Sequence, residues 1–135
     1  MAVLVSCSAA PKPFDHATLE ASATAHILAI PPPRPEKYHG LIDMKGWRNP
    51  YLVIRKDGVG LLDVANSEQR LMKPEDLIQA LAQLPASAWP YGRVVAVTQN
   101  GLTSPGDDVL IRKNRAIVAG TLESMHVLIN WVPSA

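Results

Sequence analysis

Residues 51–64 read YLVIRKDGVGLLDV, in which two apolar runs flank the tripeptide Lys56-Asp57-Gly58. Asp-Gly between apolar runs is the strongest short-range signal for a β-hairpin, because both central residues of the favoured turn need positive φ. We therefore expect an antiparallel hairpin here. Its two strands would begin the sheet around which the rest of the chain is organised.

The segments after the hairpin predict one helix and one buried strand. In KPEDLIQALAQLP, residues 73–85, Pro74 suits the first helical position, and the acidic pair after it complements the positive end of a helix. Leucine and isoleucine side chains then recur at helical spacing until Pro85 ends the pattern. The β-branched run in GRVVAVTQNG, residues 92–101, predicts a buried strand that stops at the Asn-Gly pair.

Residues 104–120, SPGDDVLIRKNRAIVAG, predict a second helix. Ser104 is a suitable N-cap, Asp107 nearly completes a capping box, and Gly120 is suited to close the helix. The β-branched residues of this stretch support an alternative, a hairpin with its turn at the Lys-Asn pair. From the sequence alone, residues 107–119 are therefore either helix or hairpin.

MHVLINWV, residues 125–132, is apolar with little alternation and is bounded by Pro133, which predicts a last strand buried on both faces. The predicted order is thus strand, strand, helix, strand, helix, strand. This order indicates the α+β class: a small mixed sheet with two helices packed on one face, preceded by a proline-rich N-terminal arm.

The arm is expected to comprise residues 1–37, and residues 38–135 the α+β domain. Within the arm, the stretch from Asp15 to Ile30 predicts a helix whose apolar face is thin. It is followed by IPPPRPE, whose four prolines favour polyproline II and exclude a helix or an inner strand. We interpret this tract as a stiff spacer, and a ligand for a proline-recognising domain is the alternative.

The composition excludes several classes of protein. The chain has 135 residues, 13 basic and 12 acidic, and its net charge of +1 gives no general attraction to nucleic acid or anionic lipid. Its single cysteine excludes an internal disulfide framework and a multi-cysteine metal site. No apolar run approaches the roughly 18 residues that a membrane-spanning helix needs, so no transmembrane segment is expected.

The single cysteine, Cys7, ends the tetrapeptide LVSC. This tetrapeptide resembles the bacterial lipobox, in which the cysteine is lipidated and becomes the mature N-terminus, and the following SAAPKP is similar to a lipoprotein tether. The resemblance implies lipidation of Cys7 and a periplasmic or envelope-associated location. It requires a start codon upstream of Met1 or a lost leader, because MAVLVSC has no basic region and only a short apolar run. The alternative is a tail with an incidental cysteine and a cytoplasmic location.

The order of elements from Tyr51 to Val132 resembles the soluble domain of the ExbD/TolR family of envelope energy-transducing accessory proteins. The segments that carry the resemblance are RKDG at the hairpin, KPEDLIQAL at the helix and the valine-rich RVVAV. Two features depart from the family: no counterpart of its N-terminal transmembrane helix, which carries the aspartate used in proton-driven force generation, is expected here, and the segment VTQNGLTSPGD differs from its usual passage from strand to helix. The family's proton-coupled activity is therefore not carried over to any residue of this chain. The resemblance implies a small dimerising α+β module that binds another envelope component.

No motif predicts a catalytic, metal or cofactor site. The four histidines, His16, His26, His39 and His126, lack the spacing of zinc ligands. No glycine-rich phosphate loop and no G-x-S-x-G elbow are present in the sequence. We therefore expect no metal and no cofactor. An enzyme would need residues that converge only in three dimensions, such as a pocket that joins His126 to Glu123 or Asp108.

Two groups of side chains are candidates for an interface. WPYG, residues 89–92, places Trp89 and Tyr91 beside a turn, where amphipathic rings suit a protein interface, and packing under the strand is the alternative. In IRKNR, the cations Arg112, Lys113 and Arg115 could meet a phosphate or a lipid headgroup, or could form a solvated helix face. The three tryptophans are too far apart in sequence to predict a stacking platform.

The expected function is therefore that of a non-enzymatic protein-binding module of the bacterial cell envelope. Edge strands made by the hairpin would let it bind a protein partner or form a homodimer by sheet pairing. The alternative is a cytoplasmic adaptor or regulatory subunit with a disordered N-terminal arm, and a small enzyme is the third hypothesis. No nucleic-acid partner is expected, and membrane contact is expected only through a lipidated Cys7.

Overall fold

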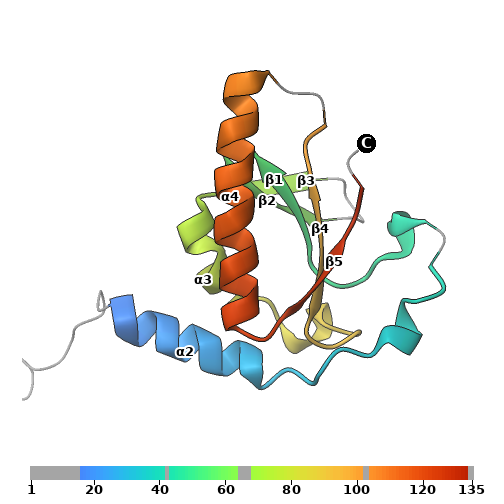
Figure 1. Ribbon diagram of the computed structural model, residues 1–135. Coiled ribbons are helices and arrows are strands. Elements are labelled where there is room, and N and C mark those ends of the chain that lie inside the picture. The colour runs from blue at the N-terminus through green and yellow to red at the C-terminus, as the bar shows by residue number, and fades with distance from the viewer. Residues whose placement is uncertain (1–15, 42, 64–67, 102–103, 134–135) are drawn as a thin grey trace, which may run out of the picture.

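A computed structural model describes residues 16–41, 43–63, 68–101 and 104–133. Their centre is a mixed five-stranded sheet in the order β3-β2-β1-β4-β5 (Figure 1). The strands are β1 (Tyr51–Arg55), β2 (Gly58–Asp63), β3 (Glu68–Met72), β4 (Val94–Gln99) and β5 (Leu128–Trp131). The helices are α2 (His16–Leu28), α3 (Leu77–Ala82), which continues a 3-10 turn at Pro74–Asp76, and α4 (Pro105–Ser124). The α+β class with a mixed sheet is confirmed.

The hairpin prediction is confirmed, with a difference at the turn. β1 and β2 pair antiparallel, and Arg55 lies opposite Gly58, so Lys56 and Asp57 form the turn. Within the expected Asp-Gly turn, only Gly58 has a positive φ, at +145°, and Asp57 does not. A Cβ on this glycine would collide with the carbonyl oxygen of Met72 on β3. Glycine is therefore required by the close approach of the neighbouring strand as well as by the turn.

The expected order lacks one strand, β3. Its sequence, EQRLM, is exposed at its first four residues, and it pairs antiparallel with β2, from Val59 opposite Met72 to Asp63 opposite Glu68. An edge strand with solvent on several of its side chains does not show the apolar alternation on which the sequence prediction depends. The sheet accordingly has five strands and not four.

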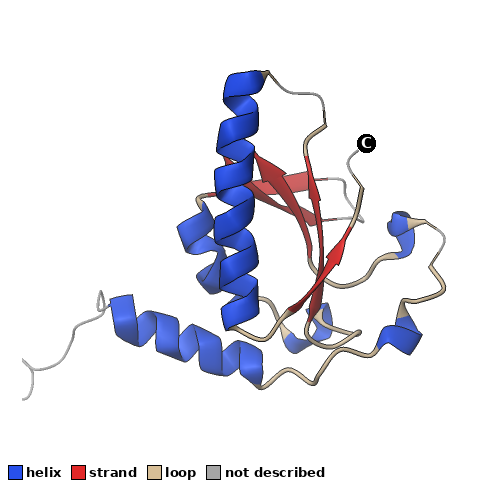
Figure 2. Ribbon diagram, viewed as in Figure 1, coloured by secondary structure: helices blue, strands red, loops and turns tan. Residues whose placement is uncertain are grey.

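Two apolar clusters fill the two faces of the sheet, and β4 contributes to both. Val95 and Val97 belong to the cluster beneath the helices, whereas Val94 and Ala96 belong to the cluster on the opposite face. This alternation follows from the two-residue period of a strand. Because β4 is parallel to both β1 and β5, the carboxyl ends of these three strands lie at the same end of the sheet. Figure 2 shows the helices grouped around the red sheet, with α4 running along it.

The face opposite α4 is covered by the segment that precedes β1. The rings of Tyr38, Trp47 and Tyr91 pack together with centroids 5.0–5.4 Å apart. The indole Nε1 of Trp47 donates a hydrogen bond to the carbonyl of Pro50 at 3.0 Å. An irregular segment therefore takes the place of a helix layer on this face.

The proline tract lies against the molecule. The backbone N–H of Arg34 donates to the carbonyl of Tyr91 at 2.8 Å, and the N–H of Arg93 donates to the carbonyl of Pro31 at 2.9 Å. Gly92, between these two partners, has φ +87°, and a Cβ there would collide with the carbonyl of Pro32. The helix before the tract, α2, packs against α3 and buries Ile27 completely in the cluster beneath the helices.

Residues 107–119 belong to one helix, so the hairpin alternative is wrong. Ser104 caps α4 by accepting a hydrogen bond from the N–H of Asp107 at 3.3 Å. The helix continues past Gly120, which was expected to close it, and ends in a Schellman motif: Val127 N–H donates to Leu122 and His126 N–H donates to Glu123. His126 takes the left-handed position at φ +57°.

Candidate protein-binding edge

The last strand, β5, is an edge strand, and the expectation that it is buried on both faces is wrong. Leu128 is 48% exposed and Trp131 is 44% exposed, because the sheet ends at β5 and no described segment covers its outer side. Figure 1 shows β5 at the margin of the sheet beside β4. The sequence shows that this run is apolar, but it does not show that the strand has a neighbouring strand on one side only.

The outer side of β5 carries backbone N–H and C=O groups that pair with no residue the structure describes. Leu128 N–H donates to the carbonyl of Arg93 at 3.0 Å, and Val132 N–H donates to the carbonyl of Val97 at 2.8 Å. Alternate residues of a strand direct their backbone groups to opposite edges. The N–H and C=O groups of Ile129 and Trp131 therefore point away from β4, and β5 is the end strand of the described sheet. These groups are the ones that an added strand would pair with.

The two edges of the sheet differ in charge. β3 carries Glu68 and Arg70 on its exposed side chains, whereas β5, with the sequence Leu-Ile-Asn-Trp, carries no charged residue. Charged side chains on an edge strand oppose pairing with another chain. β3 is therefore a protected edge, and β5 is the edge open to pairing. The expectation that the hairpin supplies the edge strands is wrong, because β1 and β2 each have a neighbouring strand on both sides.

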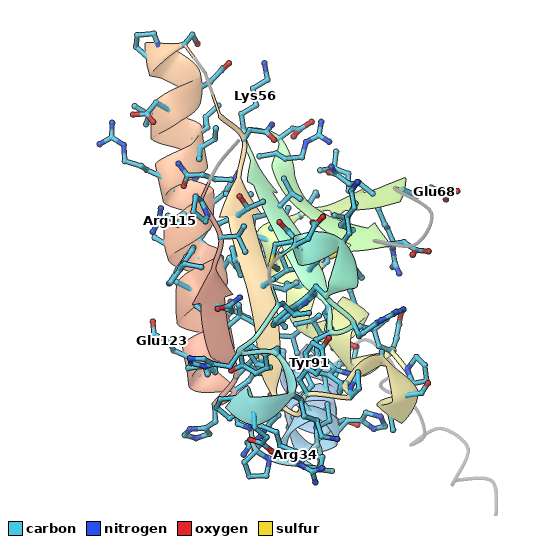
Figure 3. The ribbon with its side chains drawn as sticks, turned by 90° about the vertical axis from the view of Figure 1, so that its right-hand side faces the viewer. Arg34, Lys56, Glu68, Tyr91, Arg115 and Glu123 are labelled. Carbon is cyan, nitrogen blue, oxygen red and sulfur yellow. The ribbon has the colours of Figure 1, made fainter. Side chains whose placement is uncertain are left out.

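Arg115 lies over the end of β5. The carbon at the centre of its guanidinium is 4.2 Å from the centroid of the Trp131 ring, within the range of a cation–π contact. Its Nη1 donates a hydrogen bond to Oε1 of Gln99 at 2.9 Å. Figure 3 shows Arg115 projecting from α4 on the side of the sheet that ends in β5. Residues from β4, α4 and β5 thus meet at the carboxyl ends of two parallel strands.

A pocket of about 320 Å³ opens at this place. It is lined by Thr98, Gln99, Arg115, Trp131, Val132 and Pro133. Thr98 Oγ1 donates to the carbonyl of Pro133 at 3.3 Å, which connects the pocket's two walls. Arg115 is its only charged residue, so the described lining has a net positive charge and no acid to neutralise it.

A second, larger pocket of about 520 Å³ lies at the other end of the sheet, where β2 ends and β3 begins. Its charged lining residues are Lys45, Arg48 and Arg70 together with Asp63 and Glu68. Because both signs of charge are present in similar number, this pocket favours no ligand of one charge.

The structure separates the residues proposed for an enzyme. Asp108 lies in the first turn of α4 and Glu123 in the last, about 22 Å apart along the axis at 1.5 Å per residue. His126 is exposed in the cap beyond the helix and lines neither pocket described above. The hypothesis of a pocket joining His126 to Asp108 is therefore wrong. Within residues 16–41, 43–63, 68–101 and 104–133, no three His, Cys, Asp or Glu side chains form a group that could hold a metal ion.

The aromatic residues expected at an interface are buried. Trp89 lies in the cluster beneath the helices and Tyr91 in the cluster on the opposite face, where its hydroxyl donates to Gly46 at 3.1 Å and accepts from Arg48 N–H at 3.2 Å. Packing, the alternative interpretation, describes both rings. The aromatic residue at the exposed edge is instead Trp131, which the sequence predicted within a strand buried on both faces.

The three cations of IRKNR do not act together. Arg112 forms an ion pair with Asp108 at 2.6 Å, Lys113 is exposed, and Arg115 contacts Trp131. The three cations, for which the sequence left open a contact with phosphate or lipid headgroups or a solvated helix face, thus lie in three different environments. Cys7, the expected lipidation site, lies outside the described residues.

Comparison of the chain with protein-family models, with curated proteins and with solved structures finds no match in any of the three. Across the described part of the chain, no helix combines the length and the apolar character needed to cross a bilayer.

Proposed function

We propose that this protein is a non-enzymatic binding module that pairs the free edge of β5 with an extended segment of a partner protein or of a second copy. The observation that carries the proposal is the contrast between the two edges. β3 bears charged side chains, whereas β5 has none and exposes Leu128 and Trp131. The outer backbone groups of β5 pair with no described residue. Adding a strand to such an edge supplies main-chain hydrogen bonds, and side chains beside it supply specificity.

The proposed setting is the bacterial cell envelope, with an ExbD/TolR-like role and lipid attachment through Cys7. Its support is the LVSC tetrapeptide and the order of elements from the hairpin to the last strand. A cytoplasmic adaptor that uses the same edge is the alternative. The two differ in the fate of Cys7 and not in the binding surface.

Site-specific photocrosslinking tests the binding surface. A benzophenone amino acid replaces Leu128 on β5 in the full chain, expressed in the cells that make it, and Leu71 on β3 is replaced as the matched control. The two side chains are similarly exposed, at 48% and 46%. Discrete higher-mass adducts are expected from position 128 and not from position 71. Equal adducts from both positions, or none from position 128, would overturn the proposal.

Cell fractionation and intact-mass measurement test the setting. The gene is expressed with its full upstream reading frame in a bacterial host. Cleavage before Cys7 with added acyl chains is the expected result for a lipid-anchored protein. An unprocessed chain in the soluble fraction would overturn the envelope assignment and leave the adaptor hypothesis.

A further inference from the structure

From the contacts at the carboxyl ends of β4 and β5, we infer that the pocket holding Arg115 is a carboxylate site. It receives an acidic side chain, Asp or Glu, of the extended segment that pairs with β5. The inference rests on the proposed function, because it names the chemistry of the partner at the same edge.

The orientation of the guanidinium is the first argument. Trp131 supports one face of the Arg115 side chain, and Gln99 accepts a hydrogen bond from Nη1. In the described structure, Nε and Nη2 donate to no partner, so the side of the guanidinium that carries them is available. Two parallel N–H groups on one side of a planar guanidinium match the two oxygens of a carboxylate. The contact with Trp131 and the hydrogen bond to Gln99 hold the guanidinium in place before any ligand binds, which reduces the entropy lost on binding.

The second argument is that no described acidic side chain neutralises the positive charge of Arg115 in this pocket. Two other arginines of the described chain are neutralised by an acid: Arg112 pairs with Asp108 at 2.6 Å and Arg55 with Asp57 at 3.0 Å. Arg115 has no ion pair with any residue that the structure describes, and none of the described lining residues of its pocket is acidic. The side-chain amide of Gln99 adds further N–H donors beside the guanidinium. All of these groups complement an anion.

The position of the pocket relative to β5 is the third argument. The outward backbone groups of Trp131 would pair with an added strand, and the side chain of Trp131 is on the same side of the sheet as α4, since it contacts Arg115. Alternate side chains of an added strand project to that same side. An acidic side chain placed there lies next to the guanidinium. A polyanion fits less well, since the neighbouring cation Arg112 is already paired.

The site is tested first with a small probe. The full chain is titrated with N-acetyl-glutamate methylamide, and the NMR signals of the Trp131 indole N–H and the Arg115 Nε–H are followed, with N-acetyl-glutamine methylamide and inorganic phosphate as comparison ligands. Saturable shifts are expected with the carboxylate and not with the amide. Binding should weaken at least about tenfold in Arg115→Gln and also in Arg115→Lys, which keeps the charge but loses the planar fork. Arg112→Gln is the matched control on the same helix and should bind like the wild type.

Three results would overturn the inference: no saturable shift at Trp131, unchanged affinity in Arg115→Gln, or phosphate binding as tightly as the carboxylate. Photocrosslinking at position 128 then separates this inference from the proposed function. Loss of the adducts in Arg115→Gln but not in Arg112→Gln supports both. Adducts that persist in Arg115→Gln overturn the carboxylate contact and leave the edge-pairing function standing. Carboxylate binding without adducts at position 128 overturns the peptide as its source.

Discussion

The side-chain oxygen of Asn49 accepts a hydrogen bond from the backbone N–H of Tyr91 at 2.8 Å, across 42 residues of sequence. The amide nitrogen of the same side chain donates to the carbonyls of Gly92 at 2.8 Å and Val94 at 2.7 Å. Asn49 is only 5% exposed, so water could not readily take the place of its side chain as the hydrogen-bond partner of these three backbone groups. One asparagine thus joins the segment before β1 to the start of β4.

Asn49→Ala should lower the free energy of unfolding by about 2 to 4 kcal/mol, because it leaves buried backbone groups without partners. Urea denaturation of the purified chain measures the change. Asn100→Ala, at an exposed residue after β4, is the control and should shift stability by no more than about 0.5 kcal/mol. Equal effects of the two substitutions would show that the Asn49 bonds contribute little.

Gly92→Ala should destabilise the protein, since the residue has φ +87° and a Cβ would meet the carbonyl of Pro32. Relief of this collision requires the proline tract to separate from the loop, so amide exchange at Arg34 should accelerate together with the loss of stability. Gly120→Ala is the contrasting change, at an open position inside α4, and should stabilise by about 0.5 to 1 kcal/mol. A stable Gly92→Ala protein with unchanged exchange at Arg34 would contradict the docking of the tract.

His126→Gly should raise the free energy of unfolding by about 0.5 to 1 kcal/mol, because His126 is held at φ +57° in the left-handed position of a Schellman cap. Thermal and urea denaturation measure the gain. Ser124→Gly, two residues earlier at the last helical position, should instead destabilise by about 0.5 to 1 kcal/mol. Destabilisation by both changes would mean that the histidine side chain itself contributes to the cap.

Stability should decline in alkaline solution because of two tyrosines. Burial raises the pKa of Tyr51 above its ordinary value of 10.0, and burial followed by the charge of Glu36 raises the pKa of Tyr38. The unfolded chain ionises at the ordinary pKa, so the contribution of each neutral phenol is complete below about pH 10 and is lost as pH rises through the higher folded value. Urea denaturation of Tyr51→Phe between about pH 9 and pH 11 should show a smaller decline than the wild type. Parallel declines would exclude Tyr51 as a source of the sensitivity.

Local signals in the sequence determined most of the regular elements. The Asp-Gly pair at residues 57–58 predicted the hairpin, the proline and acids at residues 74–76 predicted the start of α3, and Ser104 with Asp107 predicted the start of α4. Each of these signals depends on the residue's own φ preference or on a hydrogen bond within one turn. It can therefore be recognised without knowledge of the rest of the chain.

The tertiary structure alone decided which strands are edges and which side chains meet. β3 lacks apolar alternation and was missed, while β5 has the composition of a buried strand and lies at the margin, because burial depends on whether another strand pairs beside it. Gly120 remained inside α4, since packing of Leu122 beneath the helix extends it beyond the local stop signal. The contact of Arg115 with Trp131 and the bonds of Asn49 join residues far apart in sequence. Such contacts follow from chain topology, which no local preference of these residues specifies.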